Sequence, residues 1–91
     1  MPKKHVKNYL NYFELGEQSF IYCEYHYVKY GAMIRGVDLH HIKYKSRGGT
    51  DEVINVICLC RECHNLAHSE QLKMPELNTA HRQFLDCNPY L

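Results

Sequence analysis

The sequence is short of long apolar runs and of net charge, and each shortage excludes a class of protein. No stretch approaches the roughly 18 consecutive apolar residues of a membrane-spanning helix. The first residues, Met-Pro-Lys-Lys-His, lead into a polar, tyrosine-rich segment without the apolar core of a secretory signal. We therefore expect no membrane partner, a cytoplasmic location and reduced thiols. A formal net charge of +1 does not by itself indicate nucleic-acid binding.

The chain is also short, and its 91 residues suffice for one domain with a small core. It has no internal repeat, low-complexity tract or linker, so we treat residues 1–91 as a single unit. A domain of this size usually needs a cross-link to stabilise it, and cysteines can supply one as disulfides or as metal ligands. Reduced thiols and the spacing of the cysteines favour metal. The five cysteines are Cys23, Cys58, Cys60, Cys63 and Cys87.

Two short motifs have the spacing of zinc half-sites. Cys23 and His26 are separated by two residues, as are Cys60 and Cys63, and this spacing lets a tight turn aim two side chains at one ion. Together they predict a tetrahedral Cys3His site for a structural Zn²⁺ ion. The alternative for His26 is an ordinary surface histidine. Cys60 to His64 also matches a c-type haem motif, which we reject because such proteins are exported and no export signal is present.

Hydrophobic patterning indicates an α+β chain. Apolar residues repeat at helical spacing from Val6 to Phe13, so we expect a short amphipathic helix that ends near Gly16. Residues 43–52 lack an apolar period and include a Gly-Gly pair, which indicates a loop between two strands. The other expected elements are an extended turn at Phe20–Cys23, a strand containing Val37, Leu39 and Ile42, a strand over Val53–Leu59, a helix from Arg61 to about Gln71, and a last helix starting near Pro75 with Leu77, His81, Phe84 and Leu85 on its apolar face.

A second set of potential ligands consists of histidines. His64 and His68 are four residues apart on an expected helix, so both side chains project from one face. Alone, such a pair could equally be a solvated face, but His40 and His41 add two imidazoles at the end of a strand. A metal beside a free imidazole is what phosphodiester hydrolysis requires, because the ion stabilises charge on phosphate while the base activates water. Histidine suits the role of base because its unperturbed pKa lies near neutral pH.

The run from Cys23 to His68 resembles an HNH endonuclease (ββα-metal) domain. The resemblance rests on Cys-Glu-Tyr-His, Val-Asp-Leu-His-His-Ile, Gly-Gly, Ile-Asn-Val-Ile-Cys-Leu-Cys and Cys-His-Asn-Leu-Ala-His, and it covers about half the chain. It implies a small α+β domain with its core motif at about residues 20–72, a zinc-knuckle pair and flanking N- and C-terminal helices. The sequence departs from the common zinc-bearing form of the family at His26, where a second knuckle cysteine usually stands.

The resemblance implies a catalytic divalent metal, Mg²⁺, Mn²⁺ or Zn²⁺, held by His40 and His64. His68 is then a third ligand or a close neighbour of the ion. Asp38 stands two residues before His40 and so on the same strand face, where it would orient a ligand or bind the metal through water. These four residues make up the predicted catalytic-metal site.

The resemblance also makes His41 the general base. Asn55 would then hold the long loop by hydrogen bonds, and the loop would in turn hold the His41 imidazole in position. Lys43, Lys45 and Arg47 alternate within that loop. By composition alone they are a solvated charged face, but beside a catalytic site they would contact the backbone phosphates of DNA. The implied activity is metal-dependent hydrolysis of DNA phosphodiester bonds.

A rival interpretation is a non-catalytic zinc module that binds nucleic acid or protein. Such a module has no need of a free base beside a metal, so the presence of His40, His41, Asn55 and His64 together argues against it, as it does against a metal-sequestering protein. The sequence leaves open the sequence preference, nicking versus double-strand cleavage, and the oligomeric state. Small free-standing proteins that resemble this one are often encoded by phages beside DNA-packaging machinery, so a phage packaging partner is a further hypothesis.

Overall fold

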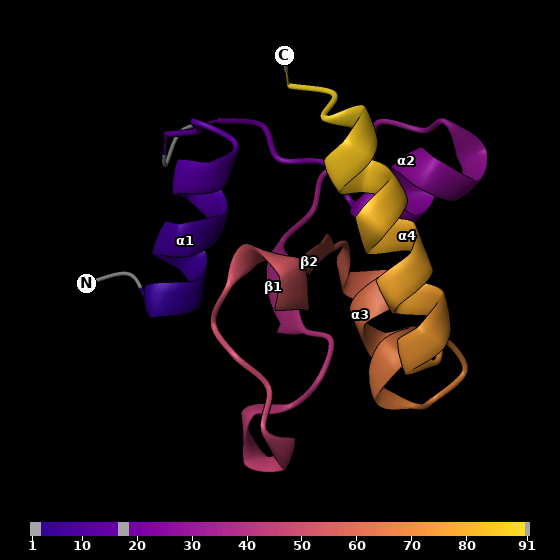
Figure 1. Cartoon of the computed structure of the whole chain (residues 1–91). Coiled ribbons are helices and arrows are strands. Elements are labelled where there is room, and N and C mark those ends of the chain that lie inside the picture. The colour runs from indigo at the N-terminus through magenta and orange to yellow at the C-terminus, as the bar shows by residue number, and fades with distance from the viewer. Residues whose placement is uncertain (1–2, 17–18, 91) are drawn as a thin grey trace.

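An antiparallel two-stranded hairpin lies at the centre of the computed structural model, which describes residues 3–16 and 19–90 (Figure 1). Its strands are β1 (Asp38–His41) and β2 (Val56–Leu59), paired from Asp38 with Leu59 to His41 with Val56. Backbone N–H groups of the flanking residues Val37 and Ile42 add one hydrogen bond at each end. The expected strand–loop–strand unit is therefore present, and it positions the histidine pair at the end of β1.

Helices cover both sides of the hairpin, with α1 on one side and α3 and α4 on the other (Figure 1). α2 packs against α4. The order β1, β2, α3 is the ββα order that the sequence resemblance implies, and within the described residues no helix is long and apolar enough to cross a membrane. The helices are α1 (Lys4–Tyr12), α2 (Glu24–Tyr30), α3 (Arg61–His68) and α4 (Met74–Cys87).

β2 is buried on both faces, because apolar layers pack against it from two sides. Successive strand residues point to opposite faces, so Ile57 and Leu59 face one layer while Val56 and Cys58 face the other. Cys58 is 2% exposed and serves as a small core residue. The layer of Ile57 and Leu59 includes Ala67, Leu72 and Leu77; the layer of Val56 and Cys58 includes Tyr9, Phe13 and Phe84.

The element boundaries differ from the sequence expectation at several turns. α1 ends at Tyr12 and not near Gly16, because the backbone turns through Glu14, which has a φ of 56°. The second strand begins at Val56, since Val53–Asn55 form a 3-10 turn (η2) that points the Asn55 side chain into the loop. A second 3-10 turn (η1, Lys45–Arg47) lies inside that loop. α3 stops at His68, three residues earlier than expected.

α2 was not expected, because its sequence, Glu-Tyr-His-Tyr-Val-Lys-Tyr, has no apolar stripe at helical spacing. Its C-terminus is capped by Gly31 in the left-handed region, at a φ of 67°. The helix is held in place by Glu24, whose side chain is fully buried. One carboxylate oxygen accepts hydrogen bonds from the Tyr9 hydroxyl at 2.5 Å and the Cys58 N–H at 3.0 Å.

The other oxygen of Glu24 lies 2.6 Å from Nδ1 of His81, which is also fully buried. Nε2 of His81 lies 2.6 Å from the carbonyl oxygen of Val53. Burial raises the pKa of Glu24, while the hydrogen bonds from His81 and Tyr9 oppose that rise. This polar cluster ties α2 to α1, β2 and α4, so the apolar face expected for α4 contains a buried polar contact at His81.

Candidate functional site

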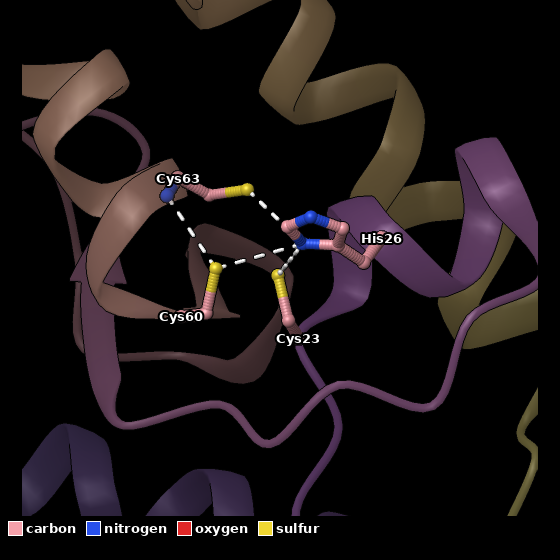
Figure 2. Close-up of side chains that lie close together, drawn as sticks. All are labelled: Cys23, His26, Cys60 and Cys63. Atoms are coloured by element: carbon pink, nitrogen blue, oxygen red, sulfur yellow. Dashed lines mark hydrogen bonds between the residues drawn. The ribbon is translucent and has the colours of Figure 1, made fainter.

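Three cysteines and one histidine converge where α2 and α3 begin (Figure 2). Nδ1 of His26 lies 3.3 Å from Sγ of Cys23, 3.5 Å from Sγ of Cys60 and 3.4 Å from Sγ of Cys63. A tetrahedral Zn²⁺ ion with ordinary bond lengths would separate its nitrogen and sulfur ligands by roughly 3.5 Å. The four side chains therefore fit a structural zinc site, and His26 belongs to the cluster.

Each half-site is the first turn of a helix. Cys23 and Cys60 are the N-cap residues of α2 and α3, and the second ligand of each pair follows three residues later. Sγ of Cys60 accepts a hydrogen bond from the N–H of Cys63 at 3.5 Å, as a capping side chain does. The predicted two-residue spacing thus corresponds to the spacing between the N-cap and the first turn of a helix.

The thiols of this cluster need a cation before they can ionise together. Burial raises the pKa of Cys23, and burial together with the neighbouring Cys23 and Cys60 thiols raises the pKa of Cys63. A bound Zn²⁺ ion reverses this, because thiolates are the ligating form and their protons are released on binding. The four candidate ligands come from α2, α3 and the residues that precede them, so an ion bound here would link these two helices.

A second cluster brings together His40 from β1 and two histidines from α3. Nε2 of His64 and Nε2 of His68 lie 3.0 Å apart, close to the roughly 3.3 Å between two nitrogens on one tetrahedral ion. The ring centroid of His40 is 5.1 Å from that of His64 and 5.5 Å from that of His68. The histidines that the sequence singled out as metal ligands do meet, and their three nitrogens fit a divalent transition-metal ion.

The carboxylate of Asp38 fixes the orientation of one of these imidazoles. Oδ2 of Asp38 lies 3.0 Å from Nδ1 of His64, so an N–H at Nδ1 donates to the carboxylate and the lone pair on Nε2 faces His68. Arg61 also contacts Asp38, at 3.2 Å. A carboxylate behind a ligating histidine is the usual outer-shell arrangement of metal sites. The structure thus places Asp38 behind the histidine cluster and within reach of His64.

His40 is the buried member of the cluster, at 6% exposure. Burial, and then the nearby His64 and His68 imidazoles, lower its pKa to about 4. His40 is therefore neutral at physiological pH, which is the form that binds a metal ion.

His41 points away from that cluster, because consecutive residues of a strand face opposite sides. Its Nε2 lies 2.9 Å from Oδ1 of Asp51, and its ring packs on His5 of α1 with centroids 4.5 Å apart. The other oxygen of Asp51 accepts a hydrogen bond from Nζ of Lys45 at 3.0 Å. The hydrogen bonds from His41 and Lys45 lower the pKa of Asp51 to about 2. Sequence reasoning missed Asp51 and His5, which carry no motif of their own.

Asn55 closes the loop that follows the histidine pair. Its side-chain carbonyl accepts from the N–H of Lys43 at 2.9 Å, and its amide donates to the carbonyl oxygens of Lys43 at 3.0 Å and Thr50 at 2.8 Å. Gly49 is required beside this contact, because a Cβ there would lie 1.8 Å from the carbonyl oxygen of Lys43. The backbone carbonyl of Asn55 also accepts from Ile42 at 2.8 Å, directly after His41.

A cleft of about 560 Å³ opens beside His40, between the loop and the start of α4. Lys43 and Arg47 line it, as does Lys73, which the sequence analysis did not select. Lys45 is not among the lining residues, and its ammonium is paired with Asp51. The three basic residues predicted together thus separate into two that face the cleft and one that belongs to the His41 cluster.

Comparison with known proteins gives one result. The family model described as HNH endonuclease matches residues 21–70, which is more than half of the chain. No curated protein and no solved structure matches the chain. The matched segment begins just before the first zinc half-site and ends just after His68, so it contains both candidate metal clusters and the loop between the strands.

Proposed function

Because the chain belongs to the HNH endonuclease family, we propose that it is a metal-dependent endonuclease that hydrolyses DNA phosphodiester bonds. The observation that carries the proposal is the pairing of two different histidine environments at one strand end. His40 meets His64 and His68 in a cluster suited to a metal, while His41 is hydrogen-bonded to a carboxylate. The first environment suits metal binding and the second suits proton transfer.

His41 is the proposed general base, and Asp51 is its positioning residue. With Nε2–H donating to Asp51, the neutral imidazole has its lone pair on Nδ1 and accepts the proton of an attacking water there. The carboxylate also stabilises the imidazolium that results, because the two groups then carry opposite charges. Asn55 acts at a distance by holding Lys43 and Thr50 together, which keeps the loop that bears Asp51 next to β1.

His40, His64 and His68 are the proposed ligands of the catalytic ion, with Asp38 orienting His64. When bound, a divalent ion supplies Lewis-acid stabilisation of the charge that develops on the phosphate and on the leaving 3′ oxygen. Three imidazoles without a direct carboxylate ligand favour Zn²⁺ or a similar transition-metal ion over Mg²⁺, which prefers oxygen ligands. The structural Zn²⁺ ion at the Cys3His cluster has no part in this chemistry.

The cleft beside His40 is the proposed path of the DNA backbone. Lys43, Arg47 and Lys73 are exposed cations along it, and each would neutralise a phosphate without reading a base. Lys45 has a different proposed role, since its contact with Asp51 places it on the carboxylate that orients His41.

Incubation of pure protein with supercoiled plasmid tests the proposal. The protein is treated with a mild chelator, restored with one equivalent of Zn²⁺ and checked for its fold by circular dichroism. Cleavage is then followed with no further metal and with added Mg²⁺, Mn²⁺ or Zn²⁺. We expect nicked or linear plasmid only with added metal. Undiminished cutting in thoroughly chelated protein would overturn the proposal, and binding without cutting under every metal would favour a non-catalytic module.

A further inference from the structure

Three residues from three separate segments meet on the far side of β1 from the metal-binding histidines. They are His5 of α1, His41 of β1 and Asp51 of the loop. One nitrogen or oxygen atom from each lies within 4.8 Å of the others, and all three residues are half-buried. The side chains of His41 and Asp51 are 18% and 15% exposed, so the group is partly open to solvent.

The donor set of this group is that of a transition-metal site. Two imidazoles and a carboxylate suit Zn²⁺ and similar ions, whereas Mg²⁺ binds imidazole poorly. The second oxygen of Asp51 stays with Lys45, which fixes the carboxylate as an outer-shell partner does but also offsets its charge. We propose that His5, His41 and Asp51 form a third cation site, which takes Zn²⁺ more weakly than the Cys3His cluster and inhibits the enzyme.

The inhibition follows from which nitrogen of His41 faces Asp51, and this step rests on the function proposed above. That nitrogen is Nε2, so an ion shared by the imidazole and the carboxylate replaces the proton on Nε2. A neutral imidazole carries one ring proton, which then resides on Nδ1. His41 thereby loses the lone pair with which it would accept a proton from water. Zinc bound by His5, His41 and Asp51 thus inactivates the general base without altering the catalytic-metal cluster.

Zinc binding tests the site without reference to activity. Equilibrium dialysis against a series of ZnCl2 concentrations counts bound ions in the parent, in His5→Gln and in Lys7→Gln, a control at an exposed position of the same helix. The parent and Lys7→Gln should bind one more Zn²⁺ ion per chain than His5→Gln does. Asp51→Asn, which removes the ligand charge, should lose the same ion. The proposal is overturned if His5→Gln and Asp51→Asn both bind as many ions as the parent.

Cleavage assays test the consequence. Because His5 packs on the ring of His41, the inhibition of each variant is measured relative to that variant's own rate at low zinc. Loss of an outer-shell partner typically weakens metal binding about 10- to 100-fold, so loss of a direct ligand should raise the half-inhibiting zinc concentration by roughly 100-fold. Equal inhibition of the parent and His5→Gln overturns the inhibitory role. If no variant cuts DNA but His5→Gln still loses one ion, the site stands and the proposed nuclease function fails.

Discussion

Replacement of His81 by alanine should destabilise the protein more than any surface substitution, because it leaves the buried carboxylate of Glu24 without one of its hydrogen-bond partners. Glu24 and His81 both have fully buried side chains, and Nδ1 of His81 lies 2.6 Å from Oε1 of Glu24. Removal of one member of such a pair leaves an uncompensated charge in the interior, at a cost of about 3–5 kcal/mol. His81→Ala also deprives the Val53 carbonyl of its partner.

That cost is large beside the whole free energy of unfolding, which is about 5–15 kcal/mol for a typical domain. With a urea dependence near 2 kcal/mol per M, a loss of about 4 kcal/mol lowers the unfolding midpoint by roughly 2 M. The assay is urea unfolding followed by circular dichroism at saturating Zn²⁺, so that the structural ion is equally bound in every variant.

Glu24→Gln is the matched control, since it removes the charge and keeps the hydrogen bonds. The glutamine carbonyl oxygen can accept from the Tyr9 hydroxyl and the Cys58 N–H, and its amide can donate to Nδ1 of a neutral His81. We expect a loss of no more than about 1.5 kcal/mol. The reasoning would be refuted if His81→Ala unfolded within about 1 kcal/mol of the parent, or if Glu24→Gln were equally damaging.

Further predictions concern the basic cleft, the buried histidine and the zinc cluster. Lys43→Ala combined with Arg47→Ala should weaken DNA binding and reduce its logarithmic salt slope by about 2, measured by fluorescence anisotropy at several salt concentrations, whereas Lys45→Ala should leave that slope unchanged. The pKa of His40 is lowered to about 4, so between about pH 4 and pH 6.5 this histidine binds more protons in the unfolded chain than in the folded one. The free energy of unfolding should therefore fall as the pH drops through that range. Urea titrations without catalytic metal should show a flatter pH dependence for His40→Gln. Cys63→Ser should lose Zn²⁺ and helical structure together, and a folded, zinc-free variant by circular dichroism and metal analysis would count against this coupling.

Local spacing made the candidate metal ligands predictable. Cys60 and Cys63 are an N-cap and first-turn pair of α3, and His64 and His68 share a face of that helix because they are four residues apart. These relations depend only on helix geometry, so they could be predicted before the fold was known. To predict that the two zinc half-sites meet, the hairpin also had to be predicted. The apolar strand before Cys60 and the Gly-Gly loop indicated that hairpin.

Contacts that depend on tertiary packing could not be predicted in this way. Glu24 and His81 are 57 positions apart, and a carboxylate gives no sequence signal that it will be fully buried, as Glu24 of α2 is. Asp51 is ten residues from His41 in a loop without regular structure, and His5 reaches the same point from another element. Nothing in the local sequence of these residues specifies a partner, so their roles follow only from the way the helices enclose the hairpin.

The most direct test of the account is single-turnover plasmid cleavage by the parent, His41→Ala and His64→Ala, with the fold and bound metal of each measured alongside. His41 is assigned to proton transfer, so His41→Ala should keep its fold, its structural Zn²⁺, its catalytic ion and its DNA affinity while losing on the order of 100-fold or more in rate. His64→Ala should stay folded with its structural Zn²⁺ but lose the catalytic ion and the activity. Cleavage by His41→Ala at the parental rate would contradict the assignment of His41 as the general base, on which the proposed mechanism depends.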